Sequence, residues 1–160
     1  MKKWTPLVLA FVALLCSSAC GEPYAVKRRA ETAIEQSLLR FHTQLNGEQY
    51  AEIYNQAHES LRREVGEADF TARLVEARKQ SGMFKTDNPI VIVNDNLLRD
   101  LSRPFRQSER VSHIETTGCE AGVAFEKFDW IVKNDEAKLA GYQFKEAGKN
   151  FVFGISGPRR

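Results

Sequence analysis

Asp129 is the side chain of this 160-residue sequence that is best placed for acid–base chemistry. It lies between two aromatic residues of a predicted strand, where a buried carboxylate would serve as a general base. Tyr54 and Tyr142 are further candidates for the same site. Strand alternation favours another interpretation, in which Asp129 points to water and pairs with Lys127 or a neighbouring strand. We favour that interpretation, so the sequence by itself predicts no catalytic residue.

Other site motifs are missing from the sequence. The three histidines at 42, 58 and 113 have no short metal-ligand spacing, and no Cys-x-x-Cys or His-Glu-x-x-His motif occurs. The glycine-containing stretches 118–122 and 154–157 do not match a phosphate loop. We therefore predict no metal and no cofactor. One helical turn separates Tyr50 from Tyr54, which favours a core position for both, with the mouth of a pocket as the alternative.

The first nineteen residues, MKKWTPLVLAFVALLCSSA, have the layout of a secretory signal. The apolar run from Leu7 to Cys16 is about half of the ~20 residues that cross a bilayer. Cleavage after Ala19 makes Cys20 the first residue, and this arrangement resembles a bacterial lipoprotein signal. The resemblance implies acyl chains such as palmitate on Cys20, and Gly21 after it implies an outer-membrane lipoprotein facing the periplasm. The predicted organisation is a signal peptide at 1–19, a tether at 20–24 and one domain at 25–160.

Ordinary secretion uses the same small-residue box, so a soluble periplasmic or secreted protein is the alternative. In that case Cys20 pairs with Cys119 in a disulfide, whereas in the lipoprotein Cys119 is a lone thiol. An intact mass measured without reduction separates these two states.

Charge argues against a nucleic-acid partner. The formal net charge is +2, from 23 basic and 21 acidic residues. Lys2 and Lys3 belong to the signal, which has no acidic residue, so the mature chain is neutral. A segment rich in arginine, 94–110, is predicted as a solvated loop, with anionic lipid headgroups as its alternative partner.

Helical periodicity fills the first half of the mature chain. It predicts helices at about 26–45, 50–61 and 67–81, the first ended by a left-handed residue at Asn46-Gly47 and the third by Gly82. Strand formers follow at 90–93, 111–117, 123–132, 138–145 and 151–155. The turn residues at 133–135 join two of these strands as a hairpin. Helices followed by strands predict an α+β fold, with three N-terminal helices packed on an antiparallel sheet of four to five strands.

These elements resemble the nuclear transport factor 2-like (cystatin-like cone) superfamily, in which the sheet is strongly bent. The stretch 41–84 is similar to envelope members of unknown function, and 120–144 is similar to the last hairpin of that group. The residues that carry the resemblance are Phe41, Gly47, Tyr50, Ile53, Tyr54, Glu67, Phe70, Leu74, Gly82, Phe128, Leu139, Gly141 and Tyr142.

The resemblance implies a fold more than an activity, because the superfamily contains both enzymes and binding modules. Our leading hypothesis is a non-catalytic, lipid-anchored envelope protein that binds a partner protein or a small apolar ligand. One alternative is an isomerase or dehydratase of the ketosteroid isomerase type, with Asp129 as base and Tyr54 or Tyr142 as oxyanion donor. Another is a homodimeric scaffold that associates through the strand face carrying Phe125 and Ile131.

Overall fold

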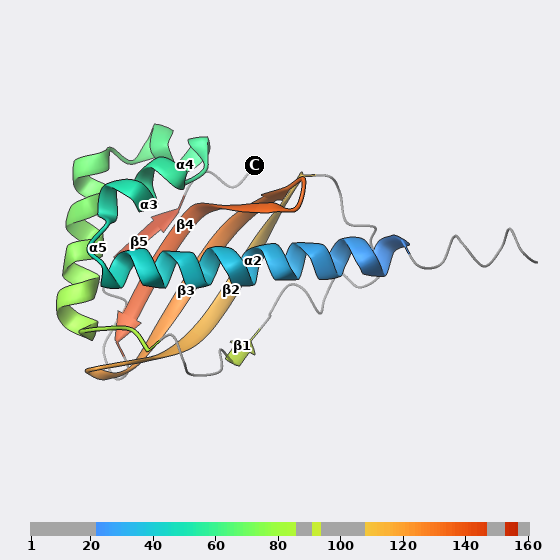
Figure 1. The fold of residues 1–160 in the computed structure, drawn as a ribbon. Helices are drawn as coiled ribbons and strands as arrows, with labels where there is room; N and C mark the ends of the chain where they lie inside the picture. Colours follow the sequence, from blue (N-terminus) through green and yellow to red (C-terminus); the bar gives the residue numbers. More distant parts are fainter. Residues whose placement is uncertain (1–21, 86–90, 94–107, 147–152, 157–160) are drawn as a thin grey trace, which may run out of the picture.

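The computed structural model describes residues 22–85, 91–93, 108–146 and 153–156 (Figure 1). The predicted signal at 1–19, Cys20 and positions 94–107 of the arginine-rich segment lie outside the described residues. Within the described ranges, no helix has the length and apolar character that a membrane span requires.

Four helices precede the sheet in the described part of the chain. They are α2 (Glu22–Asn46), α3 (Tyr50–Gln56), α4 (Glu59–Glu64) and α5 (Glu67–Ser81). The single helix expected at 50–61 is therefore wrong. Ala57 and His58 adopt extended backbone conformations that separate α3 from α4, and the His58 side chain caps α4 by accepting a hydrogen bond from the Ser60 amide. Because α2 begins at Glu22, residues 22–24 of the expected tether are helical.

Residues with positive φ follow the ends of α5 and α2. Gly82 ends α5 with φ of 68°, as the sequence predicts. A Cβ atom at Gly82 would lie 2.5 Å from a carboxylate oxygen of Glu120. The expectation for Asn46-Gly47 is wrong in detail, because the left-handed residue after α2 is Glu48, with φ of 56°.

The described strands form one antiparallel sheet in the order β1-β2-β3-β4-β5. Their bounds are Val91–Val93, Ser108–Cys119, Gly122–Lys133, Glu136–Glu146 and Phe153–Ser156. The three central strands are long, and β1 and β5 are short pieces at the edges. The predicted hairpin between β3 and β4 is confirmed, with positive φ at both Asn134 and Asp135, as in a type I′ turn.

A β-bulge in β4 changes which residues face the helices. Asp129 pairs with Gly141 and Trp130 pairs with Leu139, so Ala140 is an extra residue in β4. Leu139 and Tyr142 are consequently both buried on the helix side, although an unbroken strand would point them to opposite faces.

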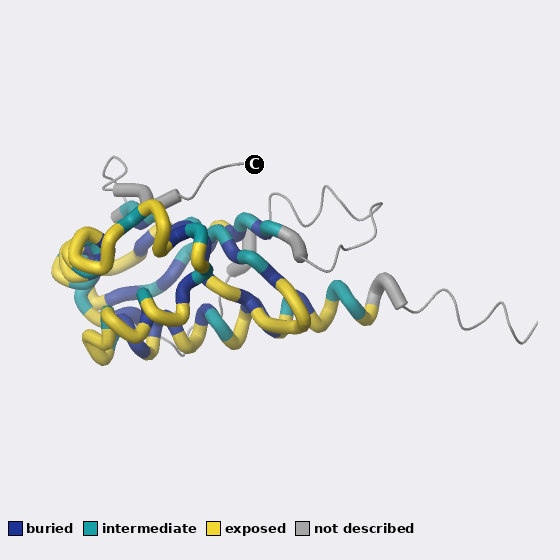
Figure 2. The backbone as a smooth tube through the Cα atoms, turned by 90° about the horizontal axis from the view of Figure 1, so that it is seen from above, coloured by how far each residue is buried: buried dark blue, intermediate teal, exposed yellow. Residues whose placement is uncertain are grey.

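The helices cover one face of the sheet, which confirms the α+β class with helices N-terminal to the sheet. In Figure 1, α2 runs across the sheet and α5 stands at one end of it. Figure 2 shows the buried residues between these layers. The fully buried large residues include Leu38, Leu45, Leu61, Phe70, Leu74, Phe128, Tyr142 and Phe144.

Candidate functional site

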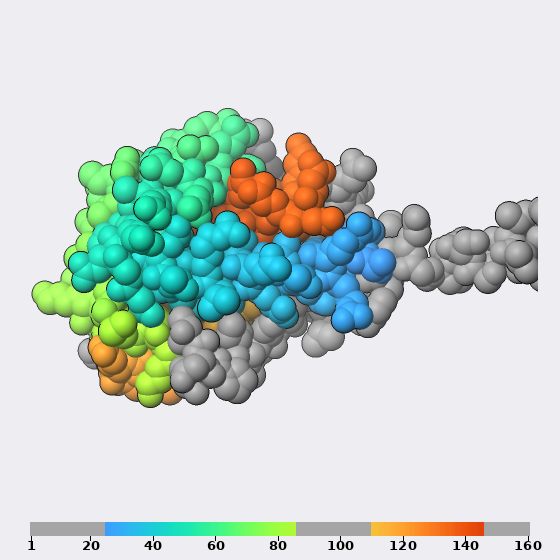
Figure 3. All heavy atoms as spheres, in the orientation of Figure 1, coloured from blue at the N-terminus to red at the C-terminus, as the bar shows by residue number. Residues whose placement is uncertain are grey.

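A groove of about 890 Å³ opens between α2, α3, α4 and the β3–β4 hairpin. This volume is in the range of pockets that hold small organic molecules. Its apolar walls come from Phe41, Ile53, Trp130 and Leu139. In Figure 3 the hairpin (orange) and α3–α4 (teal to green) rise on either side of this region, above α2. We call this hollow the hairpin groove.

Two hydrogen bonds to backbone carbonyls of β4 hold walls of the hairpin groove in place. The Ser37 hydroxyl of α2 donates to the Ala137 carbonyl at 2.9 Å, and the His58 amide donates to the Leu139 carbonyl at 2.8 Å. Two neighbouring positions of β4 therefore hold α2 and the start of α4. The groove is a built feature of the fold, because α2 and the start of α4 are both tied to the strand that forms another of its walls.

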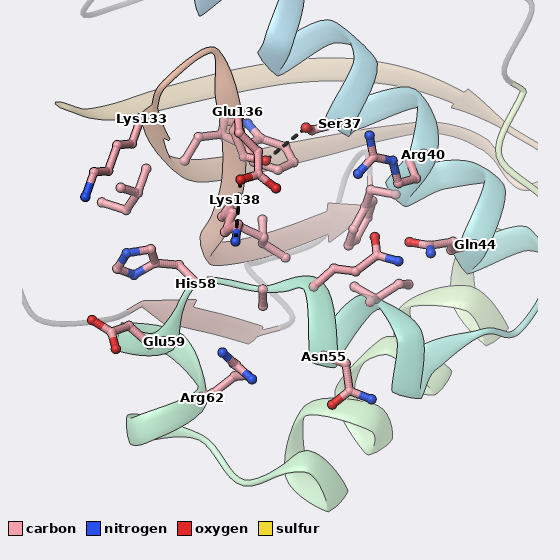
Figure 4. Close-up of a pocket in the computed structure, with 18 of the residues that line it drawn as sticks. Ser37, Arg40, Gln44, Asn55, His58, Glu59, Arg62, Lys133, Glu136 and Lys138 are labelled. Carbon is pink, nitrogen blue, oxygen red and sulfur yellow. Dashed lines mark hydrogen bonds and ion pairs between the residues drawn. The ribbon is translucent and has the colours of Figure 1, made fainter. Parts of the chain in front are cut away.

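Charged and amide side chains line the opening of the groove. Arg40, Arg62, Lys133 and Lys138 are its cationic side chains, and Glu59 and Glu136 are its acidic ones. Figure 4 shows Arg40 and Arg62 reaching toward the space between α2, α4 and the hairpin. Burial lowers the pKa of His58, so this lining imidazole is neutral at pH 7.

A second polar cluster lies inside the core. Glu126 of β3 is fully buried, and three side chains donate hydrogen bonds to its carboxylate. His42 Nε2 lies at 2.9 Å, the Thr117 hydroxyl at 2.6 Å and the Tyr142 hydroxyl at 2.6 Å. Burial alone would raise the pKa of Glu126, but the charge of His42 and the three hydrogen bonds lower it. The pKa of His42 is raised, because attraction to Glu126 outweighs its burial. The two groups form a buried ion pair.

Glu115 sits directly opposite Glu126 on β2 and is also fully buried. Both of its carboxylate oxygens lack a hydrogen-bond partner in the described part of the chain, as does Nε2 of His113, 3.7 Å from one of them. Burial raises the pKa of Glu115 to about 7; the charge of His42 acts against this shift, and the charge on Glu126 adds to it. Burial lowers the pKa of His113. Glu115 is therefore largely protonated below neutral pH, beside an ionised Glu126.

The buried cluster is separate from the hairpin groove. Of its side chains, none lines the groove, and Glu115, Glu126 and Tyr142 are at most 1% exposed. Phe41, Phe84 and Phe128 pack against the His42 ring with centroid distances of 5.1–6.0 Å. The cluster has the groups for proton transfer, but a substrate has no described route to them.

The structure does not bring the predicted acid–base residues together. Asp129 points to the sheet face away from the helices, where Ser112 donates to it at 2.6 Å and Arg110 at 3.2 Å. Tyr54 donates to backbone carbonyls of Arg62 and Val65 near the start of α5. Tyr142 alone lies in the core, bonded to Glu126. The partner of Asp129 is thus the neighbouring strand, which is one of the two pairings that strand alternation predicts.

The remaining candidates from the sequence are Tyr50, Cys119 and groups of metal-binding side chains. Tyr50 packs on the edge of the core, as its helical spacing predicts. Cys119 is buried at the end of β2, and because Cys20 lies outside the described residues, their disulfide stays a prediction. Among the described residues, no group of three or more His, Cys, Asp or Glu side chains is arranged to hold a metal ion.

The sequence does contain a signal for the buried cluster. Alternation along β3 places Glu126 on the same face as Ala124 and Phe128, which is the face that packs against helices. A two-residue turn after Cys119 then pairs Glu115 with Glu126. The arginines of the hairpin groove give no such signal, because an exposed arginine on a helix is the ordinary case.

Searches of protein-family models, of curated proteins and of solved structures find no match to this chain. No relative therefore transfers an activity or a ligand to it.

Proposed function

We propose that this chain is a lipid-anchored cell-envelope protein whose domain is a non-catalytic binding module. The observation that carries the binding role is the hairpin groove, a concave site whose walls are fixed by hydrogen bonds to β4. We also propose that the domain is a cone of the nuclear transport factor 2-like type, with β1 and β5 completing the rim of a bent sheet. The bulge at Ala140 supports this shape, because bulges bend strands.

The proposed anchor is lipid on Cys20, in an outer-membrane lipoprotein that faces the periplasm. Only Gly21 separates this cysteine from the start of α2 at Glu22. Because α2 packs in the core from Ala30 onward, only about its first two turns separate Cys20 from the folded domain, which would lie close to the membrane. Two or more acyl chains would give lasting attachment where one would not.

The occupant of the groove is a partner protein or a small ligand. The sequence suggests an apolar ligand, but Phe41, Ile53 and Leu139 under the groove are at most 4% exposed, so the apolar surface open to a ligand is small. The opening carries the exposed side chains of Arg40 and Arg62, which suit polar groups of an occupant. An occupant with polar groups therefore fits the lining better than a purely apolar one.

The isomerase alternative has weaker support. It requires a base and a hydroxyl donor that face one enclosed cavity. Asp129 lies on the open face of the sheet, and the Tyr142–Glu126 pair is sealed among aromatic rings. Binding without catalysis is the simpler role for this arrangement.

Intact and native mass spectrometry of protein extracted from its own membrane tests the proposal. We expect a covalent mass increase on Cys20, and a non-covalent ligand that is present in the native spectrum and absent after denaturation. Cys20→Ala should abolish the covalent increase and release the protein from the membrane fraction, while Cys119→Ala serves as the matched control. A chain that is unmodified at Cys20, with unchanged location in Cys20→Ala, contradicts the anchor. A native mass equal to the denatured mass argues against a retained ligand.

A further inference from the structure

The hairpin groove has an excess of positive charge that the rest of the described chain does not neutralise. Its two acidic side chains already have cationic partners, since Glu136 lies 3.5 Å from Lys138 and Glu59 lies 3.5 Å from Arg63. Within the described residues, no carboxylate pairs with Arg40, Arg62 or Lys133. Three separate elements thus contribute a cation without a counter-ion to one hollow.

The chemistry of these cationic side chains limits the class of ligand that the groove would bind. Arg40 comes from α2 and Arg62 from α4, so the two guanidinium groups approach the groove from different walls (Figure 4). Guanidinium groups form paired hydrogen bonds with the oxygens of carboxylates and phosphates. Asn55 and Gln56 of α3 add amide donors to the same lining. Oxyanions are the ligands that such a set of donors recognises.

The floor of the groove is apolar but nearly closed to solvent. Phe41, Ile53 and Leu139 line it beside Trp130, and each of these four residues is at most 4% exposed. The polar lining therefore carries the recognition of a ligand, and a volume of about 890 Å³ gives room for an organic anion rather than a bare inorganic ion.

We propose that the hairpin groove binds the phosphate or carboxylate group of a small organic anion, held by Arg40 and Arg62. The inference rests on the proposed binding role and gives it a ligand class. The anion comes either from a soluble metabolite or from the headgroup of an anionic lipid, since a domain tethered at Cys20 would lie near both. Both sources present an oxyanion to Arg40 and Arg62. The metabolite would bind from solution, whereas the headgroup would bind as part of a lipid surface.

Trp130 provides a reporter for this site. The sequence has only two tryptophans, Trp4 and Trp130, so Trp4→Phe leaves a single fluorophore, in the groove. We would titrate this full chain in neutral detergent with citrate and with sn-glycerol 3-phosphate, following calorimetric heat and Trp130 emission. A second arm replaces the soluble anions by micelles that contain phosphatidylglycerol or, as the neutral control, phosphatidylcholine.

Saturable binding in either arm, weaker at high salt, supports the inference, and the arm that responds identifies the source of the anion. Arg40→Gln/Arg62→Gln should weaken binding by about tenfold or more. The matched control is Arg28→Gln/Lys79→Gln, which removes the same charge from exposed positions outside the groove and should change affinity by less than about twofold. Equal losses in the two double variants, or no binding in either arm, overturn the inference.

Nile red, a neutral apolar probe, separates this inference from the function on which it rests. If Nile red binds in the groove and no anion does, the anion inference fails and the binding role stands. Binding of neither Nile red nor an anion counts against both. Arg40→Gln/Arg62→Gln should retain Nile red binding, which also shows that the variant is folded.

Discussion

Glu115 is fully buried, and neither of its carboxylate oxygens has a hydrogen-bond partner by geometry within the described residues. Its neighbour Glu126 has three donors, including the charged His42. Two carboxylates on facing strands cannot both ionise without a large cost, so Glu115 keeps its proton at pH values below its pKa of about 7. Tyr142 keeps its proton as well, since burial raises its pKa well above the usual value.

We predict that Glu115 makes the fold less stable as the pH rises. Its pKa is about 7 in the folded chain and 4.5 as a free side chain, so the native state binds more protons between these values. The free energy of unfolding should therefore fall by about 3 kcal/mol between pH 4.5 and pH 7, and stay lower above pH 7. Glu115→Gln removes this loss. Urea unfolding at several pH values should show the variant more stable than the wild type at pH 8, with a smaller difference at pH 4.5.

Glu126→Gln is the contrasting variant. The pKa of Glu126 is lowered, so its contribution to stability is present above pH 4.5 and is lost as the pH falls through the folded value. Removing its charge leaves His42 buried without its partner, at a cost of about 3 kcal/mol or more near pH 6. Destabilisation by Glu115→Gln at pH 8, or a difference from the wild type that does not change with pH, would contradict our account of the cluster.

The sequence predicts which face of a strand a residue lies on, but not which distant residue it contacts. Alternation on β3 is sufficient to place Asp129 away from the core and Glu126 within it. The sequence does not show that His42, 84 positions earlier, reaches Glu126, since that contact depends on how α2 crosses the sheet. Long-range partners of this kind follow from the packing of elements, which no local pattern specifies.

At the scale of elements, the extra residue Ala140 determines which side chains of β4 face the helices. On the turn side of the bulge Ala137 and Leu139 face the helices, and on the other side Tyr142 and Phe144 do. The types of the longer helices and strands could be predicted from periodicity, because α2, α5 and the three central strands are long and regular. The bulge could not, because an alternating pattern shows no sign of which residue is left without a partner. The break at Ala57 and His58 was missed for a similar reason, since apolar spacing continues across it.

Deletion of Ala140 should therefore destroy the fold, although the residue carries only a methyl group. An unbroken β4 must turn either Leu139 or both Tyr142 and Phe144 toward water. Each large apolar side chain that leaves the core lowers the free energy of unfolding by about 1.5–3 kcal/mol. We expect the deletion variant to lose cooperative thermal unfolding and the near-ultraviolet circular dichroism of its aromatic residues.

Ala140→Gly is the control, because it keeps the number of residues and the bulge. It should cost about 1 kcal/mol and leave a cooperative transition. A deletion variant as stable as Ala140→Gly would show that the register around Ala140 is unimportant.

At the scale of the whole molecule, the helices leave one face of the sheet uncovered by any described element. Ile114, Val123 and Phe125 are 36–43% exposed there, and together they make up half of the large apolar side chains that are exposed in the described chain. A soluble monomer seldom leaves such residues clustered. The sequence after the predicted signal has a formal charge of zero, so no net repulsion would oppose association of two copies. These features support the homodimer alternative.

Phe125→Glu tests this alternative directly. In a dimer that buries this face, the new carboxylate of each copy would be buried without a partner, so the variant should be monomeric at concentrations where the wild type is dimeric. Because Phe125 is 42% exposed, the melting temperature of the dilute, monomeric variant should differ little from that of the wild type. Sedimentation equilibrium in neutral detergent measures the first effect, and thermal unfolding measures the second. Val75→Glu on α5, with a similar exposure of 43%, is the matched control and should leave the dimer intact. A wild type that stays monomeric across the concentration range, or equal effects of the two variants, would leave the groove as the binding surface that the structure supports.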